Sequence, residues 1–88
     1  MKLSDFIARG KKILNEEAGS EGLVYTLATS QSISEMETEL LKISDIETVN
    51  GDTVARVEFT YPRDYGFALN TLKVVLGDID IISLQLVY

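Results

Sequence analysis

The sequence contains no cysteine and no histidine, and these two absences remove most of the side chains on which enzymes and metal sites depend. Without cysteine there is neither a disulfide nor a thiolate nucleophile, and without both residue types the usual zinc ligands are missing. No serine has an imidazole to activate it. The chemistry that remains is that of carboxylates, hydroxyls and a few cations. We therefore predict a protein that is not an enzyme and that uses no metal and no cofactor.

Long apolar runs are also missing, because the longest unbroken stretches are three residues, as in Val74-Val75-Leu76. Such runs are too short to span a membrane. The first residues form a mixed polar segment without the apolar region of a signal peptide. We therefore expect a cytoplasmic protein that makes no use of a membrane.

Basic residues are scarce, since eight Lys and Arg stand against fourteen Asp and Glu, for a net charge of −6. A negative field repels the phosphates of DNA and RNA, so direct binding of nucleic acid is not expected. The charge is uneven: residues 1–15 hold four bases and one acid, a net of +3, whereas residues 16–64 hold three bases and eleven acids, a net of −8.

Apolar residues are nevertheless plentiful, at 45% of the chain, and they occur along all of it, as expected of a sequence that folds. A chain of 88 residues has room for one hydrophobic core. We predict a single domain that comprises residues 1–88.

Two segments carry apolar residues at the spacing of a helix, residues 3–17 and residues 65–76. Ser4 is the expected N-cap of the first helix. Gly77 is well placed as the left-handed residue that follows the second helix. The alternative for the second segment is a strand over residues 72–76 that turns into a final hairpin.

Alternating or β-rich patterns predict four strands, over residues 23–29, 40–49, 53–61 and 79–88. Asn50-Gly51 is the strongest hairpin signal, because both central residues of a type I′ turn need a positive φ. In that register Asp45 lies opposite Arg56. Residues 34–43 also fit a helix, since Ser34 and Glu37 match a capping box, so the strand prediction there has a rival.

In the last of these strands Ile82, Leu84, Leu86 and Tyr88 are expected on one face. The opposite face is also fairly apolar. A strand of this kind belongs either in the middle of a covered sheet or at an edge to which another subunit adds.

These elements predict an α+β fold in two layers, with a mainly antiparallel four-stranded sheet and two helices on one face, in the order α-β-β-β-α-β.

The most distinctive feature is an acidic stretch within residues 35–52, and its candidate interaction residues are Glu35, Glu37, Glu39, Asp45 and Glu47. In an extended strand the first three would point to one side at intervals of about 6.5–7 Å, close to the phosphate spacing of a DNA strand. This pattern suggests a nucleic-acid mimic. The alternative is that the acids solvate an exposed edge strand and prevent aggregation.

A second candidate is the junction between the third predicted strand and the second predicted helix, where Tyr61, Arg63, Tyr65 and Phe67 are gathered. Aromatic and arginine side chains are typical of interaction hot spots. The alternative is that these aromatics close one end of a small core.

Asp78 and Asp80 could offer two oxygens to a metal ion. A calcium site takes six to eight, and the glutamate that completes a calcium-binding loop is missing. We expect these acids to flank a turn instead.

From these features we predict a small acidic, non-catalytic interaction domain that binds a protein partner or a second copy of itself. The alternative is an acidic nucleic-acid mimic that blocks a nucleic-acid-binding protein.

Overall fold

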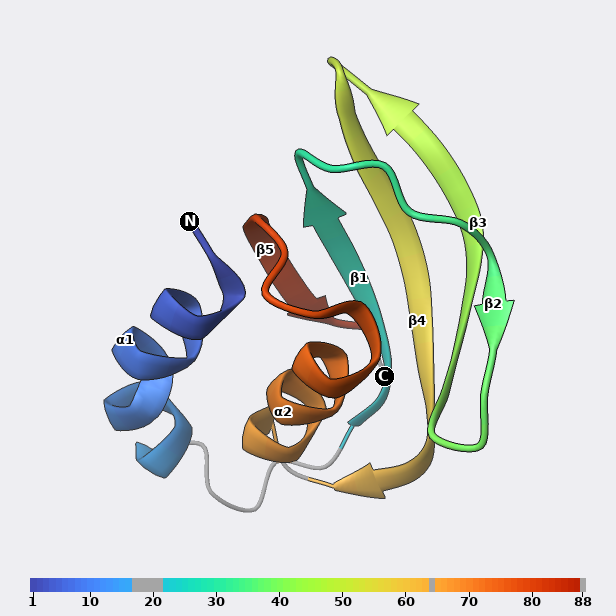
Figure 1. The fold of residues 1–88 in the computed structure, drawn as a ribbon. Coiled ribbons are helices and arrows are strands. Elements are labelled where there is room, and N and C mark those ends of the chain that lie inside the picture. Colours follow the sequence, from blue (N-terminus) through green and yellow to red (C-terminus); the bar gives the residue numbers. More distant parts are fainter. Residues whose placement is uncertain (17–21, 64, 88) are drawn as a thin grey trace.

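The computed structural model describes residues 1–16, 22–63 and 65–87, and within them the side chains of residues 1–9, 24–60, 68–85 and 87. The elements of this part of the chain are shown in Figure 1. In chain order they are α1 (Leu3–Glu16), β1 (Gly22–Thr29), β2 (Met36–Glu37), β3 (Leu41–Val49), β4 (Asp52–Arg63), α2 (Tyr65–Leu76) and β5 (Ile81–Leu86).

The strands form one five-stranded sheet in the order β2-β3-β4-β1-β5, and all neighbours are antiparallel. The predicted α+β class is confirmed, but the prediction of four strands is wrong, since the short β2 adds a fifth. β4 and β5 are both antiparallel to β1 and therefore run parallel to each other. Helix α2 makes the connection between them, and α1 packs beside α2 (Figure 1).

One hydrophobic core joins both helices to one face of the sheet. Leu3 of α1 and Leu72 of α2 are fully buried in it together with side chains from β1, β3, β4 and β5. At its centre the rings of Tyr25 and Phe59 meet edge to face, with centroids 5.5 Å apart and an interplanar angle of 83°. Such a pair stabilises the fold by about 0.5–1.5 kcal/mol beyond its buried area.

The predicted hairpin between β3 and β4 is confirmed. Asn50 and Gly51 have φ values of 52° and 84°, as a type I′ turn requires, and Val49 pairs with Asp52 across it.

The helix considered for residues 34–43 does not form, because this stretch folds back on itself at Thr38. Thr38 Oγ1 accepts hydrogen bonds from the backbone N–H groups of Leu40 and Leu41, at 3.1 and 3.2 Å. The backbone N–H of Thr38 donates to the carbonyl of Leu41 at 2.8 Å. A tight turn therefore places β2 beside β3.

Helix α1 receives its N-terminal cap from a distant residue, so the prediction of Ser4 as N-cap is wrong. The first helical bond runs from Phe6 N–H to the carbonyl of Lys2. The Asp78 carboxylate accepts bonds from the backbone N–H of Ser4 at 2.7 Å and from its hydroxyl at 2.9 Å. These bonds lower the pKa of Asp78, with the backbone N–H as the largest cause.

Helix α2 spans the predicted residues and ends at Leu76. Gly77 follows it with a φ of 81°, and its N–H donates to the carbonyl of Lys73 at 3.0 Å. The alternative strand over residues 72–76 is therefore wrong. Buried Leu69 and Leu72 show that the apolar stripe faces the sheet.

Strand β5 lies at one edge of the sheet, which is one of the two locations predicted for it. The side chains that share a face of the strand differ from the prediction. Ser83 pairs with Ala28 and Ile81 with Thr29, so Ile82 is an extra residue in a bulge. Ile81 is 1% exposed and Ile82 is 48% exposed. The expected grouping of Ile82 with Leu84 is therefore wrong.

β4 continues past Pro62 to Arg63, which pairs with Gly22 after a register shift in the β1–β4 ladder.

Candidate interaction surface

The helices cover one face of the sheet, and we call the other the open face. In β4, Ala55, Val57 and Phe59 are buried in the core, so strand alternation sends the residues between them to the open face. The same alternation places Thr26 of β1 and Lys42 of β3 there. A two-layer fold leaves this surface uncovered by any described element.

A shallow pocket of about 280 Å³ lies on the open face. We call it the valine pocket, because its apolar lining consists of Val24, Val54 and Val87, with Thr26 and Ala55 between them. Val24 is only 1% exposed, which places it at the bottom. Its carbonyl accepts a 2.8 Å hydrogen bond from the N–H of Val87, and this bond brings the residue after β5 to the pocket.

Asp45, Glu47 and Arg56 complete the lining of the valine pocket. The pairing predicted between Asp45 and Arg56 is wrong, because Ser44 pairs with Arg56 and the register shifts before Glu47. Asp45 lies in this bulge with a φ of 53°. Aspartate tolerates the left-handed conformation better than most residues.

The bulge decides where the two acids of β3 point. Ile43 is buried in the core, so an unbroken strand would send Asp45 and Glu47 to the core face as well. The extra residue reverses the alternation, and both acids line the valine pocket instead.

Charges around the valine pocket are poorly balanced. Arg56 Nη1 lies 3.6 Å from Glu58 Oε1, on the next open-face position of the same strand. Within the described part of the chain, neither Asp45 nor Glu47 takes part in an ion pair. Two carboxylates and one guanidinium thus line the pocket, and no ion pair among the described residues engages either carboxylate.

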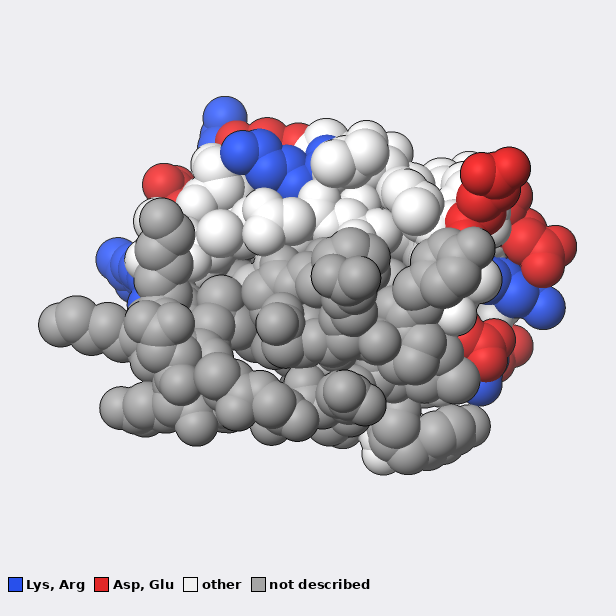
Figure 2. Space-filling model, turned by 90° about the horizontal axis from the view of Figure 1, so that it is seen from below, with Lys and Arg blue, Asp and Glu red and all other residues white. Residues whose placement is uncertain are grey.

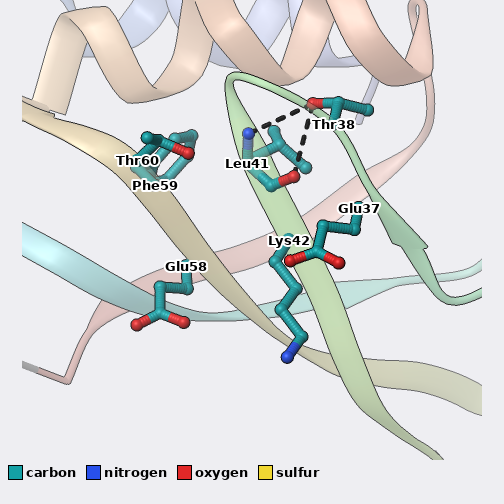
Figure 3. Close-up of a pocket in the computed structure, with 7 residues that line it drawn as sticks. All are labelled: Glu37, Thr38, Leu41, Lys42, Glu58, Phe59 and Thr60. Carbon is teal, nitrogen blue, oxygen red and sulfur yellow. Dashed lines mark hydrogen bonds between the residues drawn. The ribbon is translucent and has the colours of Figure 1, made fainter.

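A second hollow of about 250 Å³ lies between β2, β3 and β4 and is lined by Glu37, Thr38, Leu41, Lys42, Glu58, Phe59 and Thr60 (Figure 3). In the strand register Lys42 lies opposite Glu37 of β2 on one side and opposite Glu58 of β4 on the other. Figure 3 shows their three side chains extending from neighbouring strands. Opposite charges across a ladder favour its register by about 0.2–1 kcal/mol per pair, which suffices to explain this arrangement.

The predicted row of Glu35, Glu37 and Glu39 is exposed but not regular. Only Met36 and Glu37 are in β2, and Glu39 lies in the turn that follows, so the expectation of one extended strand is wrong. The even spacing of a phosphate backbone is therefore absent. Acidic side chains do gather on the side of the molecule where β2 and β3 lie (Figure 2).

The backbone of the aromatic junction is described: Tyr61 and Arg63 end β4, and Tyr65 and Phe67 begin α2. Their side chains lie outside the described part of the structure, so the hot-spot interpretation stays a prediction.

Asp78 and Asp80 lie together at the start of α1 and β5. The Asp80 carboxylate accepts bonds from the amino group of Met1, at 2.7 Å, and from the hydroxyl of Ser30. Its pKa is lowered, first by the bond from Met1 and then by that from Ser30. Among the described residues no group of three carboxylates could hold a metal ion. Asp78 therefore holds the first turn of α1, and Asp80 holds Met1, ahead of that helix, and Ser30, the residue after β1.

The apolar part of the valine pocket's lining was missed by sequence reasoning, although Asp45 and Glu47 were named. The available signal was that Val54 falls on the polar side of its strand, with Arg56 and Glu58, where an apolar side chain is out of place.

No protein-family model matches the chain, and neither curated proteins nor solved structures give a match. No helix in the described ranges has the length and apolar character needed to cross a membrane.

Proposed function

We propose that this protein is a non-catalytic interaction domain that binds a protein partner or a second copy of itself along the β5 side of the sheet. The observation that supports the proposal is a group of half-exposed apolar side chains on this side, Met1, Ile82 and Val87, which we call the β5 margin. The carbonyl of Met1 accepts a 2.6 Å bond from Ile81 N–H, so Met1 and Ile82 belong to the same edge.

Apolar side chains at a sheet edge are costly to leave in water and typical of surfaces that bind another chain. The opposite edge differs, because β2 is only two residues long and is followed by exposed Glu39. A short, charged edge strand discourages pairing. The two edges therefore favour association on the β5 side.

The β5 margin can be tested with two serine substitutions, Ile82→Ser and Val87→Ser, made together. Sedimentation from micromolar to tenth-millimolar concentrations measures self-association, and capture from lysate at low and high salt identifies a different partner. Loss of both apolar contacts should weaken either association about tenfold. Apolar contacts should also survive high salt.

Val74→Ser is the matched control, because Val74 is a valine of α2 that is 77% exposed and is not part of the β5 margin. It should leave association unchanged. A protein that stays monomeric and retains no partner would contradict the proposal, and so would an equal effect of the two variants.

The acidic nucleic-acid mimic is a second proposal, and it is favoured by the exposed Glu35, Glu37, Glu39, Asp45 and Glu47 on the β2–β3 side. It rests on charge alone, because the regular spacing is absent. Reversal of Glu35, Glu37 and Glu39 to lysine should abolish capture of a basic nucleic-acid-binding protein. Unchanged capture by the reversed variant would exclude the mimic.

A further inference from the structure

The valine pocket has the size of a site for one long side chain. Its volume of about 280 Å³ lies just below the range of about 300–1,000 Å³ that small-molecule sites occupy. The bottom is apolar, with Val24 buried and Val54 partly covered. A ligand must therefore present a slender apolar portion to this surface.

The charge of the ligand follows from the rim. Asp45 and Glu47 are both exposed and carry no ion pair among the described residues, while Arg56 is placed beside Glu58. A cation at the rim would gain two carboxylates without displacing an existing partner. Lysine and arginine combine an alkyl stem with a terminal cation, and they commonly lay the stem on apolar surface while the charge reaches polar groups.

We propose that the valine pocket binds a lysine or arginine side chain from an extended segment of a protein partner, with the stem on Val24, Val54 and Val87 and the cation between Asp45 and Glu47. The inference rests on the proposed function and names the chemistry of its partner. Val87 belongs both to the valine pocket and to the β5 margin, so a segment bound along the margin can place one side chain in the pocket.

The β3 bulge supports this assignment, because it is the feature that turns Asp45 and Glu47 out of the core face. It also holds Asp45 at a φ of 53°, a conformation that costs free energy for a residue with a side chain. Unusual backbone of this kind often aims side chains at a binding site.

The probes are three capped peptides of the sequence alanine-valine-X-valine-alanine, in which X is lysine, norleucine or diaminopropionic acid. Norleucine keeps the alkyl stem without the charge, and diaminopropionic acid keeps the charge on a short stem. Titrations followed by amide chemical shifts should show saturable changes at Thr26, Val54 and Val87 with the lysine peptide. Either analogue should bind about tenfold more weakly, since each loses one of the two contributions.

The protein variant is Asp45→Asn combined with Glu47→Gln, in which asparagine keeps a residue that tolerates the left-handed conformation. It should weaken the lysine peptide about tenfold. The charge-matched control is Glu35→Gln combined with Glu39→Gln, which likewise removes two of the fourteen acids. This control should stay within about twofold of the unaltered protein, because its charges lie outside the pocket.

Equal losses in the two variants would overturn the inference, because the attraction would then be a diffuse field and not a site. Equal binding of the norleucine peptide, or the absence of saturable shifts at the valine pocket, would overturn it as well. Association through the β5 margin is measured separately with Ile82→Ser and Val87→Ser. If association depends on the β5 margin but the lysine peptide does not bind the valine pocket, only this inference is refuted and the proposed function stands.

Discussion

Asp45 holds a left-handed backbone conformation inside a strand, in the bulge that turns the acids of β3 toward the open face. Valine is the better strand residue by propensity, but a β-branched side chain is strained at positive φ. We expect Asp45→Val to lower the free energy of unfolding by about 1–2 kcal/mol in urea denaturation. Glu47→Val, in ordinary strand geometry, should have little effect. Equal stability of the two variants would mean that the bulge does not form.

Asp78 makes the stability of the protein depend on pH. Its pKa is lower in the folded chain than in the unfolded chain, because the folded carboxylate accepts two bonds from Ser4. The ionised form therefore favours folding. Its contribution is complete above the unfolded pKa and is lost as the pH falls through the folded pKa.

The corresponding measurement is the free energy of unfolding between about pH 6 and pH 2. Asp78→Asn should be less stable than the unaltered protein at the upper end of this range, and the difference should shrink as the pH falls. Glu39→Gln, an exposed acid in a turn, is the control and should leave the pH profile nearly parallel. A constant difference between Asp78→Asn and the unaltered protein would contradict the cap assignment.

At the scale of the elements, the bulge in β5 leaves the strand continuous but determines which of two adjacent isoleucine side chains is buried. Ile81→Ala should lower the free energy of unfolding by about 2–5 kcal/mol, because Ile81 is fully buried. Ile82→Ala should change it by about 0.5 kcal/mol or less, since that side chain is half-exposed. Chemical denaturation of both variants measures the difference. The reverse order would support the regular alternation that the sequence predicts.

The elements that were predictable are those encoded by local patterns. Asn50-Gly51 specifies its turn through backbone geometry, and Gly77 marks the end of α2 for the same reason. The bulges at Asp45 and Ile82 were not predictable, because they depend on which strands pair and in what register. β2 is a two-residue strand and leaves no periodic signal.

At the scale of the molecule, acidic side chains gather on the β2–β3 side (Figure 2), and like charges that lie close together repel one another. Added salt should therefore raise the free energy of unfolding, since a Debye length of about 10 Å at 0.1 M screens these charges. Substitution of Glu35 and Glu39 by glutamine should stabilise the protein by a few tenths of a kcal/mol at low salt and flatten the salt dependence. Denaturation at several salt concentrations measures both effects, and an unchanged salt dependence would contradict this account.

The order of the sheet explains why the acids of the candidate site were found from the sequence and the pocket was not. Asp45 and Glu47 belong to the acidic stretch within residues 35–52, which the charge pattern alone identifies. Their neighbours Val24 and Val87 reach them only because β1 lies between β4 and β5, an arrangement set by packing of the whole chain.

The central place of β1 also bears on how the protein is made. β1 leaves the ribosome before both of its partners, which are residues 52–63 and residues 81–86. A nascent chain that stops short of β5 has one side of β1 unsatisfied, and such an edge can pair with other chains. The sheet can close only after residues 81–86 have been made, and the long sequence separation between β1 and β5 should make that closure slow.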